Sequence, residues 1–120
     1  MHELSICDGL VRAVLAELAK LGPPPPVLRT TRLVVGEWRQ VVPANLQAAY
    51  DVLVRDTPAA GSTLVIETVP VTGHCRQCGW EGTPPARTLV CGRCAAAGLD
   101  LLTGTELYLR SLEVDDADGA

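Results

Sequence analysis

Four cysteines in two closely spaced pairs are the residues of this chain whose type and spacing point most directly to chemistry. Cys75 and Cys78 form one Cys-x-x-Cys pair, Cys91 and Cys94 form the other, and twelve residues separate the pairs. Two intervening residues let the chain turn tightly enough for both sulfur atoms of a pair to face one ion. The pattern predicts one structural zinc ion held by four thiolates, with no coordination position open to water.

The residues around the cysteines support this interpretation. Gly79 and Gly92 are expected to supply the permissive backbone that such tight turns, here called knuckles, require. A thioredoxin-like redox site would use a single pair at the start of a helix, and the paired turns with glycine favour zinc over an iron–sulfur cluster. His74 directly precedes Cys75 and could replace a thiolate as a ligand, although a histidine that faces solvent or only contacts a ligand is the simpler alternative.

The N-terminus offers a second set of metal ligands. Met1 supplies an α-amine with an ordinary pKa of about 7.7–8.0, and His2 supplies an amide nitrogen and an imidazole. These three nitrogens can form fused chelate rings in a planar arrangement that suits Ni(II) or Cu(II) rather than zinc. Glu3 could donate a carboxylate oxygen or neutralise charge. Ligand chemistry alone leaves a solvated histidine without a metal as the alternative.

Charge and composition limit the function classes. The 120 residues carry a net charge of −4, and the ten Lys and Arg residues are scattered, which disfavours nucleic acid because phosphate binding needs clustered basic residues. The chain has two histidines, no Gly-rich phosphate loop and no Ser/His/Asp constellation, so we expect no enzymatic activity. Aliphatic residues must build the core, because Phe is absent and aromatic residues make up only 3%.

No stretch predicts a signal peptide or a transmembrane helix. The first apolar segment, 4–21, is interrupted by four charged residues, and no other apolar run approaches the length of about 20 residues that a membrane span needs. We therefore expect a cytoplasmic protein with no membrane partner. In a reducing compartment, two Cys-x-x-Cys pairs indicate thiolate ligands rather than disulfides.

Apolar periodicity predicts the elements that must position these residues. A stripe from Leu4 to Leu18 at helical spacing predicts a first helix, in which Cys7 is interpreted as a buried thiol. Gly22 and the four prolines after it end this helix. The expected order is a helix over 4–21, a strand over 27–35, a helix from Pro43 to a stop at Asp56, a strand over 63–71, the zinc module and a strand over 105–114.

The predicted fold class is α+β: two helices on one face of a three-stranded mixed or antiparallel sheet, with an inserted zinc-ribbon-like lobe. The strands 63–71 and 105–114 flank the cysteine segment, so we expect them to pair with each other in antiparallel orientation at its base. The predicted domains are an α/β domain that carries the candidate nickel site, the zinc lobe and a frayed acidic tail. The α/β domain comprises 1–72 plus 104–116, the zinc lobe comprises 73–103, and the tail comprises 117–120.

The chain opens with Met1-His2-Glu3-Leu4-Ser5-Ile6-Cys7, which closely resembles the opening of the hydrogenase/urease nickel incorporation protein family, HypA. The similarity continues in the same order over nearly the whole chain. It includes the two cysteine pairs and the segments Val34-Val35-Gly36-Glu37, Leu64-Val65-Ile66-Glu67 followed by Val69-Pro70, and Gly104-Thr105-Glu106-Leu107.

The resemblance implies a nickel metallochaperone that delivers Ni(II) for maturation of [NiFe] hydrogenase and, in some organisms, of urease. It identifies His2 as the principal nickel ligand, Met1 as a ligand through its amine and Glu3 as a supporting residue. It also implies zinc on the four cysteines, in a lobe whose geometry responds to nickel and pH. The implied partners are the nickel-handling GTPase HypB and the large subunit of the hydrogenase, and we expect a monomer or weak dimer.

Two positions depart from the family pattern. Members often have proline after the third cysteine, where this chain has Gly92, and some carry an acidic residue before the second helix, where this chain has Val41-Val42-Pro43. The alternative function is a zinc-ribbon adaptor that mediates protein contacts without nickel transfer, which gives the N-terminal residues no role. The nickel affinity, a further nickel ligand and the recipient hydrogenase do not follow from the sequence.

Overall fold

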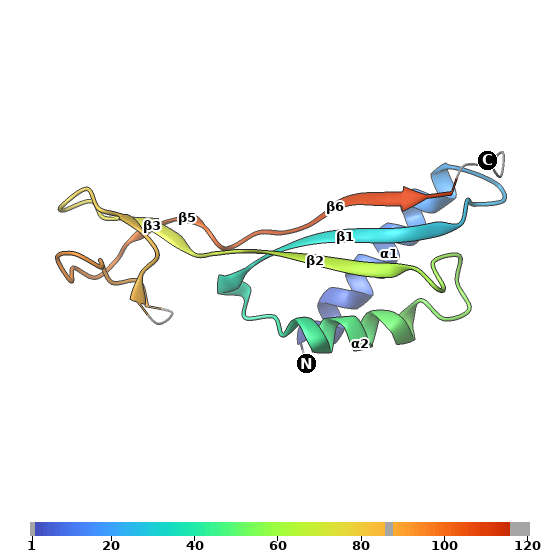
Figure 1. The fold of residues 1–120 in the computed structure, drawn as a ribbon, viewed down its shortest axis with the longest axis horizontal. Helices are drawn as coiled ribbons and strands as arrows, with labels where there is room; N and C mark the ends of the chain where they lie inside the picture. The colour runs from blue at the N-terminus through green and yellow to red at the C-terminus, as the bar shows by residue number, and fades with distance from the viewer. Residues whose placement is uncertain (1, 86–87, 116–120) are drawn as a thin grey trace. The chain divides into compact units, whose positions relative to one another are not determined.

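The computed structural model describes residues 2–85 and 88–115 and contains two helices, one short 3-10 helix and six strands within them (Figure 1). The chain divides into two compact units. The described residues of the helical unit fall within Met1–Leu33, Val41–Glu67 and Leu109–Ala120, and those of the cysteine unit within Val34–Gln40 and Thr68–Tyr108. The elements are α1 (His2–Lys20), β1 (Leu28–Gly36), η1 (Glu37–Arg39), α2 (Pro43–Leu53), β2 (Thr63–Val69), β3 (Thr72–His74), β4 (Glu81–Gly82), β5 (Asp100–Thr103) and β6 (Leu107–Val114).

Helix α1 forms where the apolar stripe predicts a helix, but it begins two residues earlier than the stripe. Its buried residues recur every three or four positions, which is the spacing of one helix face. They are Cys7, Leu10, Val11, Val14 and Leu18. Leu4, which we assigned to the stripe, is instead 46% exposed, so the buried face starts one turn later. No helix in the described residues is long and apolar enough to cross a membrane.

Helix α2 begins at Pro43, as expected from the preference of proline for the first helical position. It buries Leu46 and Tyr50 and packs against α1. The hydroxyl of Tyr50 is fully buried and lies 2.9 Å from Oγ1 of Thr31 and 2.5 Å from Oγ of Ser62. These hydrogen bonds join α2 to β1 and to the turn before β2, and they satisfy the only buried aromatic hydroxyl in the core of the described residues.

The larger sheet has the strand order β2-β1-β6, and the two helices cover one of its faces (Figure 1). The predicted direct pairing of 63–71 with 105–114 is therefore wrong, because β1 lies between the two strands. Gly36 donates to the carbonyl of Glu106 at one end and Asp115 donates to that of Val27 at the other, which makes β1 and β6 antiparallel. Strands β1 and β2 are connected through α2 and run in the same direction in Figure 1, so the sheet is mixed, as expected.

The central place of β1 follows from its composition. Leu33, Val34 and Val35 are consecutive in sequence and all at most 3% exposed, whereas every residue of β6 is at least partly exposed. A strand buried on both faces reads as a continuous apolar run and belongs in the middle of a sheet. Strand β2 ends at Val69, two residues before the predicted bound of 71, because Pro70 cannot donate to a strand ladder.

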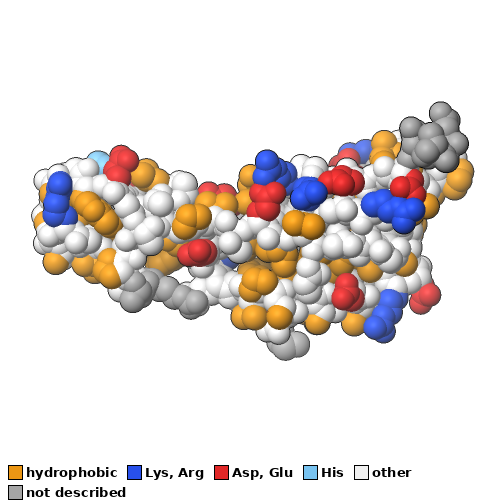
Figure 2. Space-filling view, viewed as in Figure 1, with side chains coloured by type: hydrophobic (Ala, Val, Ile, Leu, Met, Phe, Trp, Pro, Cys, Tyr) orange, Lys and Arg blue, Asp and Glu red, His pale blue; other side chains and the backbone are white. Residues whose placement is uncertain are grey.

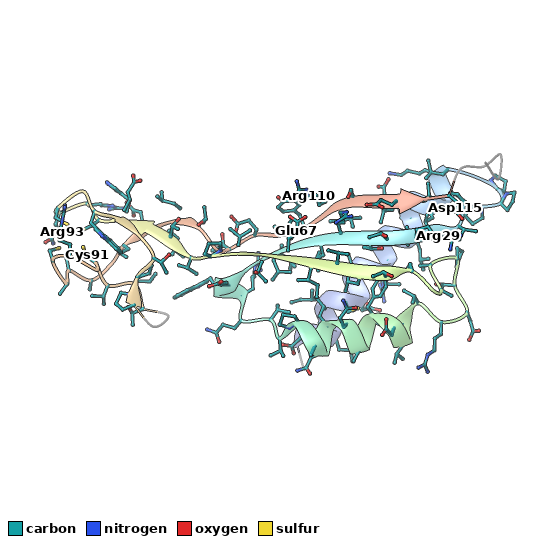
Figure 3. The ribbon with its side chains drawn as sticks, viewed as in Figure 1. Arg29, Glu67, Cys91, Arg93, Arg110 and Asp115 are labelled. Carbon is teal, nitrogen blue, oxygen red and sulfur yellow. The ribbon has the colours of Figure 1, made fainter. Side chains whose placement is uncertain are left out.

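Ion pairs join β6 and the residue that follows it to the other two strands of the larger sheet, and Figure 3 labels two of these pairs. Arg110 contacts Glu67, Arg32 lies 2.8 Å from Glu113, and Arg29 lies 2.6 Å from Asp115. On the face that Figure 2 shows, acidic and basic side chains are accordingly interspersed. Asp115 is thus held by Arg29, and the expected frayed residues 117–120 lie outside the described part of the chain.

The cysteine unit contains a second, smaller antiparallel sheet with the order β4-β3-β5.

Near the start of β6, the backbone of Gly36 lies so close to Gly104 that a Cβ atom on Gly36 would stand 2.0 Å from the carbonyl oxygen of Gly104. Trp38 in η1 donates its backbone N–H to the same oxygen. Two segments that carry the family resemblance are therefore brought together by a contact that only glycine permits at position 36.

Candidate metal centre

The first knuckle connects β3 to β4 and turns at Gly79. The N–H of Cys75 donates to the carbonyl of Trp80 over 2.8 Å, and the N–H of Gly79 donates to the carbonyl of Cys75 over 2.9 Å. Gly79 has φ of +79°, which a residue with a side chain adopts only at a cost. The expectation that this glycine permits the turn is therefore met.

The second knuckle repeats the same hydrogen bonds with a different residue at the turn. The N–H of Cys91 donates to the carbonyl of Ala96, and the N–H of Ala95 donates to the carbonyl of Cys91. Ala95, not Gly92, has the left-handed backbone, with φ of +62°. The assignment of Gly92 as the permissive residue is thus wrong, because the left-handed residue of each knuckle directly follows its second cysteine. Gly92 has another role, which is described below.

The four cysteine sulfur atoms converge on one point. All four Sγ atoms lie within 4.8 Å of one another, and no other group of three or more potential metal ligands converges elsewhere in the residues that the structure describes. The Sγ atoms of Cys75 and Cys94 are 3.7 Å apart, and those of Cys78 and Cys91 are 3.5 Å apart. Sulfur atoms about 2.3 Å from the centre of a tetrahedron lie about 3.8 Å apart. The geometry therefore fits one four-coordinate ion with sulfur ligands.

Backbone N–H groups of the knuckles stabilise the ionised form of two of these thiols. The N–H of Trp80 lowers the pKa of Cys78 to about 6, despite the opposing effect of burial. Burial would raise the pKa of Cys91, but the N–H groups of Cys94 and Arg93, each 3.3 Å from its sulfur, outweigh that effect and lower it. Thiolates are the form of cysteine that binds metals, so the local backbone prepares the ligands.

The fourth thiol behaves differently when no ion shares its charge. The N–H of Ala96 lowers the pKa of Cys94, but burial and the other three thiols together raise it to about 11. Four thiolates this close repel one another, so the last of them ionises only with difficulty. A divalent cation at the centre removes this repulsion, and the cluster as a whole is therefore suited to a cation and not to four free thiols.

An arginine in each knuckle contacts another part of the cysteine unit, and Figure 3 labels Arg93. Arg93 in the second knuckle donates from Nη2 to the carbonyl of Cys78 in the first knuckle over 2.6 Å. Arg76 makes a bidentate ion pair with Asp100 on β5, with distances of 2.7 and 2.6 Å. These contacts join the knuckles to each other and to the small sheet. Sequence reasoning missed Arg93 and Trp80 as residues of the site, because both lie between the ligands and their roles depend on contacts distant in sequence.

His74 lies at the end of β3, opposite Glu81 on β4 and Asp100 on β5. It is not among the ligand atoms that converge on the metal centre. Cys7, the fifth cysteine, is fully buried in α1, and its sulfur lies 4.0 Å from the carbonyl oxygen of Leu46. Burial raises the pKa of Cys7 to about 11, which makes it an unreactive core thiol, as expected.

The candidate nickel ligands lie at the start of α1. His2 is the first residue of this helix, whereas the sequence pattern starts the helix at Leu4, and Met1 lies outside the described residues. Glu3 is half-buried, and its Oε2 accepts a hydrogen bond from the backbone N–H of Val42 over 3.1 Å. Val42 is the residue before α2, so the first turn of α1 contacts the segment that leads into α2.

Three comparisons place this chain among known proteins. The sequence model of one family, described as hydrogenase/urease nickel incorporation metallochaperone HypA, matches residues 1–114. The chain is 34% identical over 118 residues to a hydrogenase maturation factor HypA of Dehalococcoides mccartyi, which covers 97% of this chain and 96% of that protein. It is 37% identical over 119 residues to a hydrogenase maturation factor HypA of Solidesulfovibrio magneticus, with 96% and 100% covered.

The fold is similar to that of a solved structure. The solution structure of the Ni metallochaperone HypA from Helicobacter pylori superimposes with a TM-score of 0.60 over 93% of this chain and 96% of that chain. The two sequences are 23% identical. The similarity therefore shows a shared fold.

Proposed function

Because this chain belongs to the HypA family of hydrogenase/urease nickel-incorporation metallochaperones, we propose that it binds Ni(II) at its N-terminus and delivers the ion for maturation of a [NiFe] hydrogenase. The observation that carries the proposal is the family match over residues 1–114, which includes Met1, His2 and Glu3. Urease is a second possible recipient. The recipient subunit and the GTPase HypB are the partners that we propose.

The position of His2 at the start of α1 favours a nitrogen chelate. The first four backbone N–H groups of a helix have no partner within the helix. The amide nitrogen of His2 is one of them, so it can become a metal ligand without breaking a hydrogen bond of α1. Together with the α-amine of Met1 and the imidazole of His2, it would supply three nitrogens of the planar kind that suits Ni(II).

Glu3 supports the same site by holding its backbone. Its carboxylate accepts a hydrogen bond from Val42, and an acidic side chain in the first turn also suits the positive end of the dipole of α1. The carboxylate thereby ties the first turn of α1 to the start of α2. In our proposal, Met1 and His2 bind the ion, and Glu3 restrains the chain on which they lie.

We propose zinc as the ion on the four cysteines. A site of four thiolates in two knuckles suits tetrahedral Zn(II), and a shell that is complete with protein ligands leaves no position for substrate. The zinc supplies folding free energy to the cysteine unit when bound. The protein would then make or break no bond in a substrate and would act in the cytoplasm, where thiolates stay reduced.

Nickel titration of the protein with its natural N-terminus tests the function. His2→Ala should weaken Ni(II) binding by more than about 100-fold, because it deletes a primary ligand and loss of an outer-shell partner already costs 10–100-fold. The matched control is His74→Ala, which removes the only other histidine of the chain and should leave nickel binding unchanged. Calorimetry gives the affinity, and the electronic spectrum distinguishes a planar nitrogen site from an octahedral one.

The pH dependence of the same titration gives a second readout. Amine and imidazole nitrogens must lose their protons to bind, so nickel affinity should fall as pH drops toward about 6. If His2→Ala takes up one nickel per chain with the parental affinity, the ion binds elsewhere. That result would favour the alternative of a zinc-ribbon adaptor, which needs no function of the N-terminus.

A further inference from the structure

The six-membered ring of Trp80 lies directly against the second knuckle. A Cβ atom on Gly92 would stand 2.6 Å from Cζ2 and 2.9 Å from Cη2 of Trp80. A Cβ atom on Gly82 would stand 2.7 Å from the same Cζ2. Carbon atoms that are not bonded do not approach this closely, so the ring occupies the space that side chains would need at both positions.

Trp80 is itself held by the first knuckle. Its carbonyl accepts the N–H of Cys75, and its half-buried indole packs against the apolar cluster of Cys75, Cys91 and Leu99. One side chain that leaves the first knuckle therefore contacts the loop between the two cysteines of the second. Besides the shared ion, this contact and the hydrogen bond from Arg93 to Cys78 connect the knuckles.

The contact explains why Gly92 stands where many relatives are expected to have proline. Its backbone is not in the left-handed region, so the conformation does not require glycine. The ring of Trp80 does require it, because any larger residue would displace the indole. Positions 80 and 92 are therefore coupled: a large aromatic residue at one demands the absence of a side chain at the other.

We propose that Trp80 is a positioning residue that holds the second knuckle against the ion and thereby slows exchange of the ion in the four-cysteine site. An ion can leave only after sulfur atoms detach, and Cys94 is the exposed one of the four. Detachment of the second knuckle requires Gly92 to separate from the indole. The packing of Trp80 therefore opposes the first movement that would open the site.

Such a residue has a specific use in a protein that carries nickel, and this part rests on the proposed function. Affinity for divalent ions at a given site generally rises from Co(II) through Ni(II) to Cu(II), and thiolates do not by themselves exclude nickel in favour of zinc. A knuckle that separates slowly keeps the resident ion in place while the cargo is bound at the N-terminus. Trp80 would thus protect the structural site from the cargo.

The first test measures transfer of zinc from the full-length, zinc-loaded protein to the chromogenic chelator 4-(2-pyridylazo)resorcinol. Trp80→Ala should accelerate transfer about tenfold, because truncation removes the packing of the indole on the second knuckle. Trp80→Phe, which keeps a ring, should restore most of the difference. The matched control is Trp38→Ala, since Trp38 is the only other tryptophan and lies outside the knuckles. Transfer from Trp80→Ala within twofold of the parental rate would overturn the proposal.

A double-mutant cycle tests the contact itself. Gly92→Ala should accelerate transfer in the parent, because the new methyl group displaces the indole, and should have no further effect in the Trp80→Ala background. If Trp80→Ala cannot be loaded with zinc, Trp80→Leu, which also lacks the six-membered ring, takes its place. Effects that add fully in both backgrounds would show that Gly92 and Trp80 act separately, and the proposal would be wrong.

A nickel challenge separates this proposal from the proposed function. With excess Ni(II), Trp80→Ala should acquire thiolate-to-nickel absorption in the near ultraviolet and lose zinc, while the parent protein should not. Nickel binding at the N-terminus should be the same in both proteins. If His2→Ala shows that the N-terminus binds no nickel, the chelator experiment still decides the role of Trp80, because it contains no nickel.

Discussion

The helical unit and the cysteine unit are stabilised in different ways. The helical unit buries aliphatic side chains from α1, α2, β1 and β2 around Tyr50, and its buried hydroxyl groups are hydrogen-bonded to one another. The apolar cluster beside the cysteine ligands consists of Cys75, Cys91 and Leu99, with Cys78, Trp80 and Ala96 packed against it. We expect a cluster this small not to offset the conformational entropy of the surrounding loops, so we predict that folding around the cysteines depends on an ion.

In the proposed function, the two kinds of unit have different tasks. An apolar core positions the N-terminus of α1 without any metal, so the proposed nickel site exists before the cargo arrives. The cysteine unit, in contrast, is expected to lose order when its proposed ion is removed. If the two units are stabilised independently, a change in one of them should leave the other folded.

The largest effect is expected from removal of the resident ion. Cys75→Ser combined with Cys91→Ser deletes one ligand from each knuckle and should abolish zinc binding, because structural zinc contributes directly to folding free energy. Amide hydrogen exchange should then become fast in β3, β4 and β5, while α1 and α2 keep their protection. Retention of about one zinc per chain in this variant would show that the assignment of the ligands is wrong.

A large cavity in the helical core should have the opposite selectivity. Leu46 is fully buried in α2, and Leu46→Ala should destabilise the helical unit by about 2–5 kcal/mol. Val52→Ala on the same helix is the control, because Val52 is 53% exposed and its truncation should change the unfolding free energy by less than about 0.5 kcal/mol. Denaturant unfolding followed by helical circular dichroism gives both values. Loss of zinc at the same denaturant concentration in both variants would support the independence of the units.

A smaller, stabilising effect is expected at the turn of the second knuckle. Ala95 has φ of +62° where the equivalent residue of the first knuckle is Gly79. Ala95→Gly should therefore stabilise the zinc-loaded cysteine unit by up to about 1 kcal/mol. Removing the backbone strain of a left-handed residue that is not glycine is worth about 1–2 kcal/mol. The greater conformational freedom of glycine in the unfolded chain offsets part of this gain. The measurement is the zinc concentration at half saturation. An unchanged or weaker affinity would contradict the assignment of strain to Ala95.

The smallest effect concerns the ion pair of Arg29 with Asp115 in the helical unit. The hydrogen bond from Arg29 and the charge of its guanidinium hold the pKa of Asp115 below the ordinary value for an aspartate. A lowered pKa in the folded state stabilises the protein above the ordinary pKa, about 3.9, and this contribution is lost as pH falls through the folded pKa. Both side chains are largely exposed, so the effect is small.

Asp115→Asn should therefore lower the midpoint of thermal unfolding slightly at pH 7, and the difference should disappear as the pH falls below the folded pKa of Asp115. The cysteine unit should respond to acid at higher pH, because protons compete with the ion for thiolates. Simultaneous loss of zinc and of helical structure during acid titration would show that the two units do not respond separately.

Several features followed from local sequence because their causes are local. Two intervening residues within each Cys-x-x-Cys pair bring its sulfurs to one side of a turn, so the metal site needed no knowledge of the fold. Helical spacing from Cys7 to Leu18 defines the buried face of α1, and the preference of proline for the first helical position places the start of α2 at Pro43. The extent of α1 beyond Leu4 to His2 did not follow, because a helix end lacks an apolar pattern.

Other features were decided only by contacts between distant segments. The apolar run of β1 is compatible with several strand orders, and burial on both sides places it between β2 and β6. Glycine after a cysteine suggests backbone freedom, yet Gly92 is required by the ring of Trp80, while the strained turn belongs to Ala95. Sequence spacing determines which atoms can share one ion, because a knuckle closes within a few residues. The packing of one knuckle on the other depends on side chains that approach only after the whole unit has folded.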